Sequence, residues 1–188
     1  MRPALIVLAD DHRAGVPGLT YDPSAADVLL KRTLDVARQV GGVGRVLLFS
    51  PAEAEAELTS RSLGFRLWPA DGDSPGRRYA NAFRQAGELG YEGALVLGLG
   101  APSLPASRVS EAAALLEEHQ GVLLPDGAGG VTLLGLQAAE PTLFPPGPAL
   151  PTEEEIRTRA RQQLVRLHEL EPWPALTPGT VDDYLAGA

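Results

Sequence analysis

Short apolar runs alternate along the chain with longer stretches whose apolar residues recur at helical spacing. The runs are rich in Val, Leu and Ile, which is typical of strands that are buried on both faces of a parallel sheet. The stretches between them have the period of crossover helices. This pattern predicts strands at residues 4–9, 45–50, 65–69, 93–99, 121–125 and 131–136.

The predicted helices begin at recognisable signals. Ser50-Pro51 and Ser74-Pro75 each offer a capping side chain and a first-turn proline, and Thr152 can cap the helix that follows it. Helices are therefore expected after Pro23-Ser24, after Ser50-Pro51, after Ser74-Pro75, at residues 105–119, from residue 152 to about residue 170, and at 181–185, with a Pro-rich surface loop at 141–151.

The last two predicted strands are separated by only five residues, Asp126 to Gly130. This linker is too short for a crossover helix, so the two strands either form an antiparallel hairpin or diverge. The whole pattern predicts an α/β fold, a three-layer α/β/α sandwich with a mostly parallel sheet and one antiparallel strand. A chain of 188 residues without an internal repeat is expected to form a single domain.

Composition excludes several functions. The net charge of -8 disfavours a nucleic-acid-binding surface, because such surfaces neutralise phosphates with Lys and Arg. Cysteine is absent, which removes disulfides, thiolate metal sites and cysteine nucleophiles and fits a reducing compartment. The apolar run at 4–9 is too short for a signal peptide or a membrane span, so we expect a cytoplasmic protein. The high proline content and the missing cysteine also fit a thermophile.

In an open α/β sheet a ligand binds outside the carboxyl ends of the strands, so the segment after each strand is a candidate site. Asp10-Asp11-His12 follows the first strand and is succeeded by a Gly/Pro-rich stretch that ends at Gly18. This segment could hold a divalent cation or wrap a nucleotide, or it could be a solvated loop.

Asp71-Gly72-Asp73 follows the third strand and has the Asp-x-Asp pattern of metal-dependent glycosyltransferases. The simpler interpretation is that Asp73 and Ser74 cap the next helix. Gly76-Arg77-Arg78 then lies in the first helical turn, where free N–H groups and a guanidinium can receive phosphate. The two arginines could equally be ordinary exposed residues.

Two glycine-rich segments follow later strands. Gly98 to Pro105 is a weak phosphate-loop signal, with Gly98 and Gly100 as its flexible positions. In the Asp126 to Gly130 linker, Gly129 and Gly130 would let a substrate approach the backbone closely. His119 and His168 are expected on helices as solvated or capping residues. No Gly-x-Ser-x-Gly elbow is present to organise a hydrolase triad.

These segments, in this order, resemble a bacterial glycosyltransferase A-like family. That family is related to the molybdenum-cofactor and phospholactate guanylyltransferases and belongs with the nucleotide-diphospho-sugar transferases. Its D-L-G-x-R-M-x-x-A-F motif is similar to residues 74–83, its G-T-D-S-P-x-L-P to residues 98–105, and its G-P-x-x-D-G-G-Y-x-L-I-G-L to residues 124–136. The residues retained are Gly76, Arg78, Ala82, Phe83, Gly98, Pro102, Leu104, Pro105, Pro125, Gly129, Gly130, Leu133, Gly135 and Leu136.

The chain departs from the family at charged positions. The metal-binding Asp of G-T-D-S-P is replaced by Gly100, and the Asp of D-G-G-Y is replaced by Ala128. The basic loop after the first strand keeps only Val16-Pro17-Gly18, and the family's D-V-D-T-P is represented by residues 177–180 without its acids. A nucleoside diphosphate with its Mg or Mn ion needs carboxylates for the metal and cations for the phosphates.

The resemblance implies a nucleotide or nucleotide sugar as ligand, contacted by Gly76, Arg78, Gly100, Asp126, Gly129 and Gly130. Two functions remain open. The chain is either a divergent glycosyl or nucleotidyl transferase, with acids such as Asp10, Asp11 or Asp126 rebuilding a metal site, or a noncatalytic relative that binds a ligand or a partner. Catalytic residues, the oligomeric state and the identity of donor and acceptor are not specified by the sequence.

Overall fold

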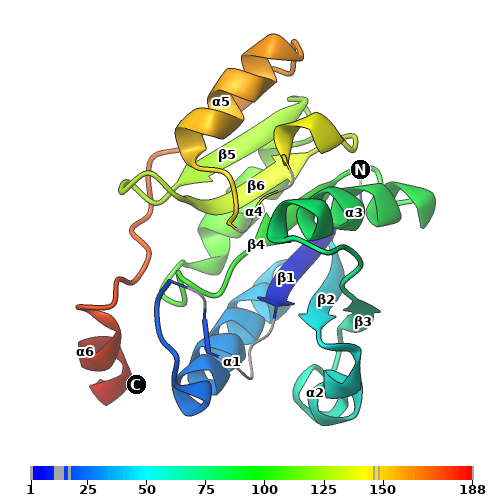
Figure 1. The fold of residues 1–188 in the computed structure, drawn as a ribbon. Helices are drawn as coiled ribbons and strands as arrows, with labels where there is room; N and C mark the ends of the chain where they lie inside the picture. The colour runs from blue at the N-terminus through cyan, green and yellow to red at the C-terminus, as the bar shows by residue number, and fades with distance from the viewer. Residues whose placement is uncertain (1, 11–14, 17, 146, 148, 188) are drawn as a thin grey trace.

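The computed structural model describes residues 2–187 apart from 11–14, 17, 146 and 148. Its centre is a seven-stranded sheet in the order β3-β2-β1-β4-β6-β5-β7 (Figure 1). Only β6 runs antiparallel to its neighbours, β4 and β5, and all other pairs are parallel. The strands are β1 (Ala4–Asp10), β2 (Gly44–Ser50), β3 (Arg66–Pro69), β4 (Ala94–Leu97), β5 (Gly121–Pro125), β6 (Val131–Leu136) and β7 (Leu167–Glu169).

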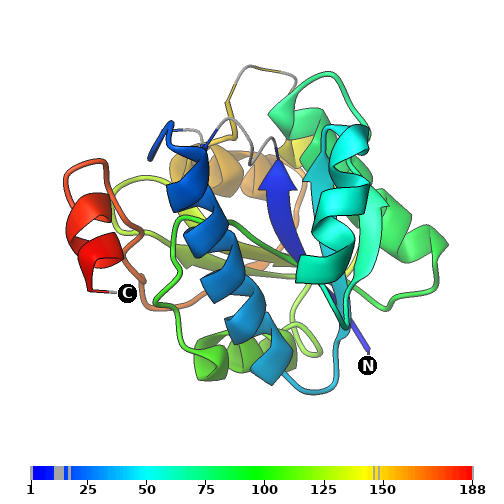
Figure 2. The ribbon, with the colours of Figure 1, turned by 90° about the horizontal axis from the view of Figure 1, so that it is seen from below.

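The sheet is buried on both faces because successive side chains of its central strands point to opposite sides. Leu5 and Val7 of β1 pack into one apolar cluster, and Ile6 packs into the other. The first cluster is completed by α1 (Pro23–Gln39), α2 (Glu55–Arg61), α4 (Ala106–Leu115) and Val181 of α6 (Val181–Ala186). The second contains residues of α3 (Pro75–Glu88) and α5 (Glu153–Gln162). The predicted three-layer α/β/α sandwich is therefore confirmed, as Figure 2 shows along a second direction.

The predicted caps are present at two helices and displaced at another. Ser74 accepts a hydrogen bond from the backbone of Arg77 at 3.4 Å, and Thr152 forms a reciprocal capping box with Glu155. The first helix is capped by Asp22 rather than within Pro23-Ser24. A helix follows Ser50-Pro51 as expected, but the expected cap was wrong. Pro51 is itself the N-cap residue of a short 3-10 helix, η2 (Ala52–Ala54), that has no side-chain cap and leads directly into α2.

Two predictions for the C-terminal half need correction. The fifth helix ends at Gln162 rather than near residue 170, and residues 167–169 form the edge strand β7. His168 therefore lies on a strand, and its ring stacks on that of His119, beyond the end of α4, at a centroid distance of 4.5 Å. The predicted surface loop at 141–151 contains a 3-10 helix, η3 (Pro141–Leu143), and Phe144 from this segment packs on Phe83 of α3.

The choice left open for the Asp126 to Gly130 linker is resolved as a hairpin, since β5 and β6 pair antiparallel from Gly121↔Leu136 to Pro125↔Val131. The predicted terminal helix is confirmed as α6. None of the helices in the described part of the chain has the length and apolar character needed to span a bilayer.

Candidate functional site

A pocket of about 580 Å³ opens at the carboxyl ends of β1 and β4. This is where ligands bind in open α/β sheets, because the loops after adjacent parallel strands diverge there. Three predicted segments meet in it: the end of the loop after β1, the first turn of α3 and the bend after β4. Its described lining consists of Leu8, Gly15, Val16, Gly18, Leu19, Pro75, Arg78, Tyr79, Gly98, Leu99, Gly100, Val131, Ala149, Leu150, Ala175 and Leu176.

Arg78 is the one charged side chain in this described lining. The Ser74 cap and Pro75 start α3 so that Arg78 falls in its first turn, beside N–H groups that have no partner within the helix. The Nε atom of Arg78 donates to the carbonyl oxygen of Gly72 at 3.0 Å, which holds the side chain at the pocket wall. A guanidinium beside a helix N-terminus can receive an anionic group.

The bend after β4 presents backbone rather than side chains to the pocket. A Cβ atom at Gly98 would meet no described atom within 4 Å, and one at Gly100 would touch only Ala175 at 3.7 Å. Packing therefore does not require glycine at Gly98, and its absent side chain leaves the backbone open to a ligand. The carbonyl oxygen of Gly100 accepts a hydrogen bond from the backbone of Leu176 at 2.7 Å.

Tyr79 forms another part of the wall, and its phenol is kept neutral. Burial raises the pKa of Tyr79 above its ordinary value. The ring also packs on Phe144 at a centroid distance of 5.6 Å. The helical periodicity of the sequence marks Tyr79 as a core residue, and the structure shows that it faces both the core and the pocket.

Asp126 is engaged in closing the β5–β6 turn. Its Oδ1 atom accepts hydrogen bonds from the backbone N–H groups of Ala128 at 2.7 Å and Gly130 at 2.8 Å. A Cβ atom at Gly130 would lie 2.4 Å from the Asp126 carboxylate, so a larger residue there would displace the carboxylate from this position. Gly129 has a φ of +101°, and its carbonyl accepts from the backbone of Glu153 at 3.0 Å. The predicted ligand-binding residues Asp126, Gly129 and Gly130 are not among the described lining of the pocket. Val131 is the residue of this hairpin that lines it.

Gly76 also lies outside the described lining. It is buried where α3 crosses the segment after η3, and a Cβ atom there would lie 2.4 Å from the carbonyl oxygen of Pro145. Its local role is therefore close packing of the helix. Its predicted contact with a ligand stays a prediction.

The acidic residues after β3 are at the surface. Asp71 accepts a hydrogen bond from Asn81 at 3.3 Å and lies 3.9 Å from Arg84, whereas Asp73 pairs with Arg77 at 3.4 Å. Neither acid belongs to the described lining.

Asp11 and His12 lie outside the described residues, as does the side chain of Asp10. In the part of the chain that is described, no three His, Asp or Glu side chains are grouped as metal ligands would be.

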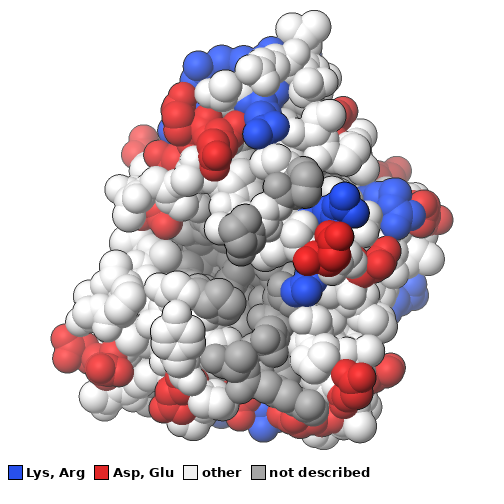
Figure 3. All heavy atoms as spheres, viewed as in Figure 1, with Lys and Arg blue, Asp and Glu red and all other residues white. Residues whose placement is uncertain are grey.

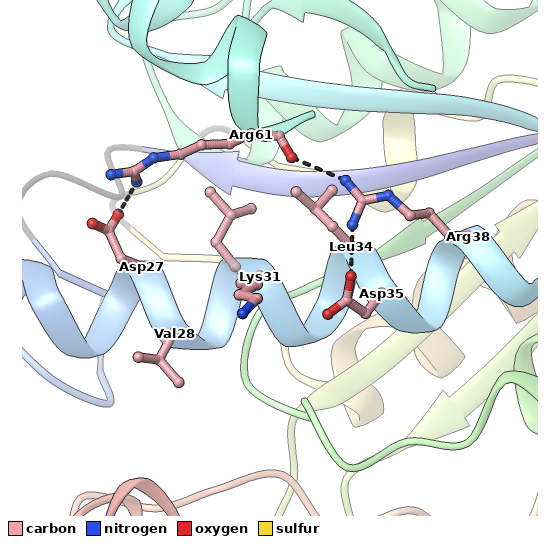
Figure 4. Close-up of a pocket in the computed structure, with 8 residues that line it drawn as sticks. Asp27, Val28, Lys31, Leu34, Asp35, Arg38 and Arg61 are labelled. Atoms are coloured by element: carbon pink, nitrogen blue, oxygen red, sulfur yellow. Dashed lines mark hydrogen bonds and ion pairs between the residues drawn. The ribbon is translucent and has the colours of Figure 1, made fainter. Parts of the chain in front are cut away.

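A groove of about 390 Å³ between α1 and α2 is a different kind of feature (Figure 4). Arg61 forms an ion pair with Asp27 near one end, and Arg38 bonds to Asp35 at 2.6 Å and to the Arg61 carbonyl at 2.9 Å near the other. The Asp27 carboxylate raises the pKa of Arg61. These contacts tie α2 to α1 across the groove, with Leu34 between them.

Comparison with known families decides the relationship of the chain. Residues 33–147 match the model of a family described as "Uncharacterized protein conserved in bacteria (DUF2064)". The protein belongs to the DUF2064 family. The matched region of this DUF2064 protein contains the three motifs on which the resemblance rests. No curated protein matches the sequence with significance.

Solved structures share the fold of this DUF2064 protein at low sequence identity. A Desulfovibrio desulfuricans G20 protein provisionally named a nucleotide-diphospho-sugar transferase superposes with a TM-score of 0.81 at 15% identity, covering 97% of this chain and 85% of that one. A CMP:2-keto-3-deoxy-manno-octonic acid synthetase in complex with CTP gives 0.62 at 10% identity, with 99% and 98% covered. A nucleotidyl transferase from Methanothermobacter gives 0.64 at 16% identity, with 99% and 95% covered. The chain thus has the nucleotide-diphospho-sugar transferase fold.

Proposed function

We propose that this DUF2064 protein binds a nucleotide or a nucleotide sugar in the pocket at the ends of β1 and β4. The observation that carries the proposal is the pairing, in one pocket, of open backbone at Gly98 with the guanidinium of Arg78 at the start of α3. An anionic phosphoryl group would lie against Arg78. The base or sugar would lie along the apolar wall near Leu99 and Leu176.

The names of the structural neighbours support this ligand class. They include nucleotidyl and sugar-nucleotide transferases, and one neighbour is in complex with CTP. The pocket of about 580 Å³ lies within the usual range for small-molecule sites.

The described lining contains no carboxylate, and the side chains of Asp10, Asp11 and His12 lie outside the described residues. By the resemblance, Gly100 stands where the family carries its metal-binding Asp, and the Oδ1 atom of Asp126 accepts two backbone hydrogen bonds within its own turn. We therefore propose a transferase-fold protein whose metal-dependent chemistry is reduced or lost. A metal-dependent glycosyl or nucleotidyl transferase is the second candidate, favoured by the position of Asp10 at the carboxyl end of β1.

Isothermal titration calorimetry against nucleotides and nucleotide sugars, each with and without Mg or Mn, tests both candidates. We expect at least one ligand to bind with an affinity that the metal leaves unchanged. Arg78→Gln should then weaken binding by about tenfold or more, because a charge-assisted contact contributes about 1.5–3 kcal/mol. Arg84→Gln, at an exposed position of the same helix, is the matched control and should bind like the wild type.

Metal-dependent binding would instead support the transferase, and turnover assays on the same ligand would follow. Silence across the whole panel would overturn the nucleotide proposal.

A further inference from the structure

A separate pocket of about 570 Å³ lies between the C-terminal end of α5 and the edge strand β7. It shares no lining residue with the pocket at the ends of β1 and β4. Apolar side chains and three arginines meet there. The lining consists of Arg157, Ala160, Arg161, Leu164, Val165, Arg166, Leu167 and Glu169.

Leu164 is unusual in this pocket for two reasons: its backbone is left-handed, and its apolar side chain is exposed. The backbone of Val165 donates to Ala160 at 2.9 Å and that of Leu164 donates to Arg161 at 3.2 Å, which is the helix ending that normally places glycine at the position of Leu164. Leu164 nevertheless adopts a φ of 58°, and the residue is 83% exposed. A left-handed leucine is strained, and an exposed one gains little packing in return, so Leu164 points to a function outside the fold.

The backbone of β7 offers an unoccupied edge beside Leu164. β7 is the last strand of the sheet, and within the described part of the chain it pairs with β5 alone. Gly121 donates to the carbonyl of Arg166, and Leu170 donates to Leu123, so alternate residues from Arg166 onward face β5. The backbone N–H and C=O groups of Leu167 and Glu169 then point away from β5. Such an edge can accept a further strand.

The charge of this pocket is opposite to that of the whole protein. Arg157 is neutralised by Glu169, to which it donates two hydrogen bonds at 3.0 and 2.9 Å. No carboxylate of the described residues lies within 4.0 Å of the Arg161 or Arg166 side chain. In a chain with a net charge of -8, basic atoms gather over α5, next to a group of acidic atoms, in the upper part of Figure 3.

We propose that β7 and this pocket form a docking site for an extended acidic segment of a partner protein. The segment adds to the sheet as a strand along β7, sets its carboxylates against Arg161 and Arg166, and covers Leu164 with an apolar side chain. A second copy of this chain fits less well, because a two-fold axis at this edge would place the arginines against their own counterparts. Charge complementarity thus selects an acidic partner.

The test uses the full chain and a fluorescein-labelled peptide of alternating glutamate and valine, followed by fluorescence anisotropy. We expect saturable binding that is at least tenfold tighter than that of the matching lysine–valine peptide. The Arg161→Glu/Arg166→Glu variant should weaken binding by at least tenfold. Arg32→Glu/Arg84→Glu changes the net charge equally at exposed positions outside the pocket and should bind like the wild type.

A peptide with the same sequence and alternate N-methylated amides separates strand addition from simple ionic attraction. It keeps every charge but cannot complete the backbone pairing, so it should bind at least tenfold more weakly. The proposal is overturned if the acidic peptide does not bind, if N-methylation has no effect, or if both double variants lose binding equally. It is also overturned if sedimentation shows a dimer of the wild type that Arg161→Glu/Arg166→Glu dissociates, since the occupant is then a second copy.

Discussion

The guanidinium of Arg157 on α5 donates two hydrogen bonds to the carboxylate of Glu169 on β7, from Nε at 3.0 Å and from Nη2 at 2.9 Å. This contact raises the pKa of Arg157, with smaller contributions from Glu153. It also fixes the edge strand to the helix above it. The pair is bidentate, and both side chains are partly buried from solvent. It should therefore stabilise the fold more than an ordinary surface ion pair does.

Loss of the Arg157–Glu169 pair should therefore change the free energy of unfolding by a measurable amount. Glu169→Gln should lower the free energy of unfolding by about 1 kcal/mol, at the upper end for partly exposed pairs. Glu88→Gln breaks the exposed pair of Glu88 with Arg84 on α3 and should change stability by less than about 0.5 kcal/mol. Urea denaturation at neutral pH checks both. Equal effects of the two changes would show that the bidentate geometry adds nothing.

Two glycines of α3 should respond oppositely to the same substitution. Gly76→Ala places a Cβ atom against the Pro145 carbonyl at 2.4 Å, and backbone cannot easily yield, so we expect a loss of about 1–3 kcal/mol. At Gly87 the added Cβ atom meets nothing within 4 Å, and alanine should stabilise the helix by up to about 1 kcal/mol. Thermal unfolding of the two variants decides. A stable Gly76→Ala protein would contradict the close packing.

Gly98→Ala should separate binding from folding. The new methyl group enters open space in the pocket, so the unfolding transition should stay within about 0.5 kcal/mol of the wild type. Nucleotide binding should weaken because the methyl group occupies the ligand's approach to the backbone. Calorimetry with the ligand identified in the panel measures this. Unchanged affinity would remove Gly98 from the site without affecting the fold.

The capping box of α5 should be sensitive to acid. Hydrogen bonds from the backbone and side chain of Thr152 lower the pKa of Glu155 from 4.5. A lowered folded-state pKa stabilises the protein above the unfolded value, and this contribution is lost as the pH falls through the folded value. Wild type should thus be more stable than Glu155→Gln at pH 7, and the difference should shrink as the pH falls below 4.5 and through the lowered folded-state pKa of Glu155. Denaturant curves at pH 7 and at a series of acidic pH values measure this, and a difference that stays constant across the series would exclude the linkage.

Leu164→Gly tests the strain at the end of α5. Glycine adopts a positive φ without penalty, so we expect a gain of about 0.5–1 kcal/mol in stability. The same change should weaken binding of the acidic peptide, because the apolar contact is removed. A gain in stability together with a loss of binding is the expected signature of a residue retained for function.

The architecture could be predicted from the sequence because its signals are local. Short apolar runs such as Val46–Phe49, bounded by turn signals and alternating with helical stretches, favour doubly buried strands, and all six predicted strands are present. β7 was missed because it has only three residues and because Leu164, Val165 and Leu167 prolong the apolar spacing of the preceding helix. The helix ends at a turn that leucine rarely adopts, and periodicity does not detect that.

The pocket was predictable only in part. The rule that ligands bind at the carboxyl ends of strands identified the segments that contain Arg78 and Gly100, and the structure brings these two together. The wall formed by Ala175 and Leu176 was not foreseen. This wall forms because the C-terminal segment packs against the bend after β4, where the backbone of Leu176 donates a hydrogen bond to the carbonyl of Gly100. No local sequence pattern predicts such a long-range contact. The sequence left Asp126 open as a metal ligand, because a sequence does not show that a carboxylate already accepts hydrogen bonds from its own turn.

The C-terminal segment brings residues from outside the family match into the wall of the pocket. The family match ends at residue 147 and starts at residue 33, whereas Leu8, Leu19, Leu150 and Leu176 of the pocket lie outside those limits. The shared core supplies Arg78 and the glycine bend, and the flanks supply most of the apolar wall. Two relatives could therefore agree over the whole common core and still accept different molecules, so swapping the flanking segments between them should exchange their ligands.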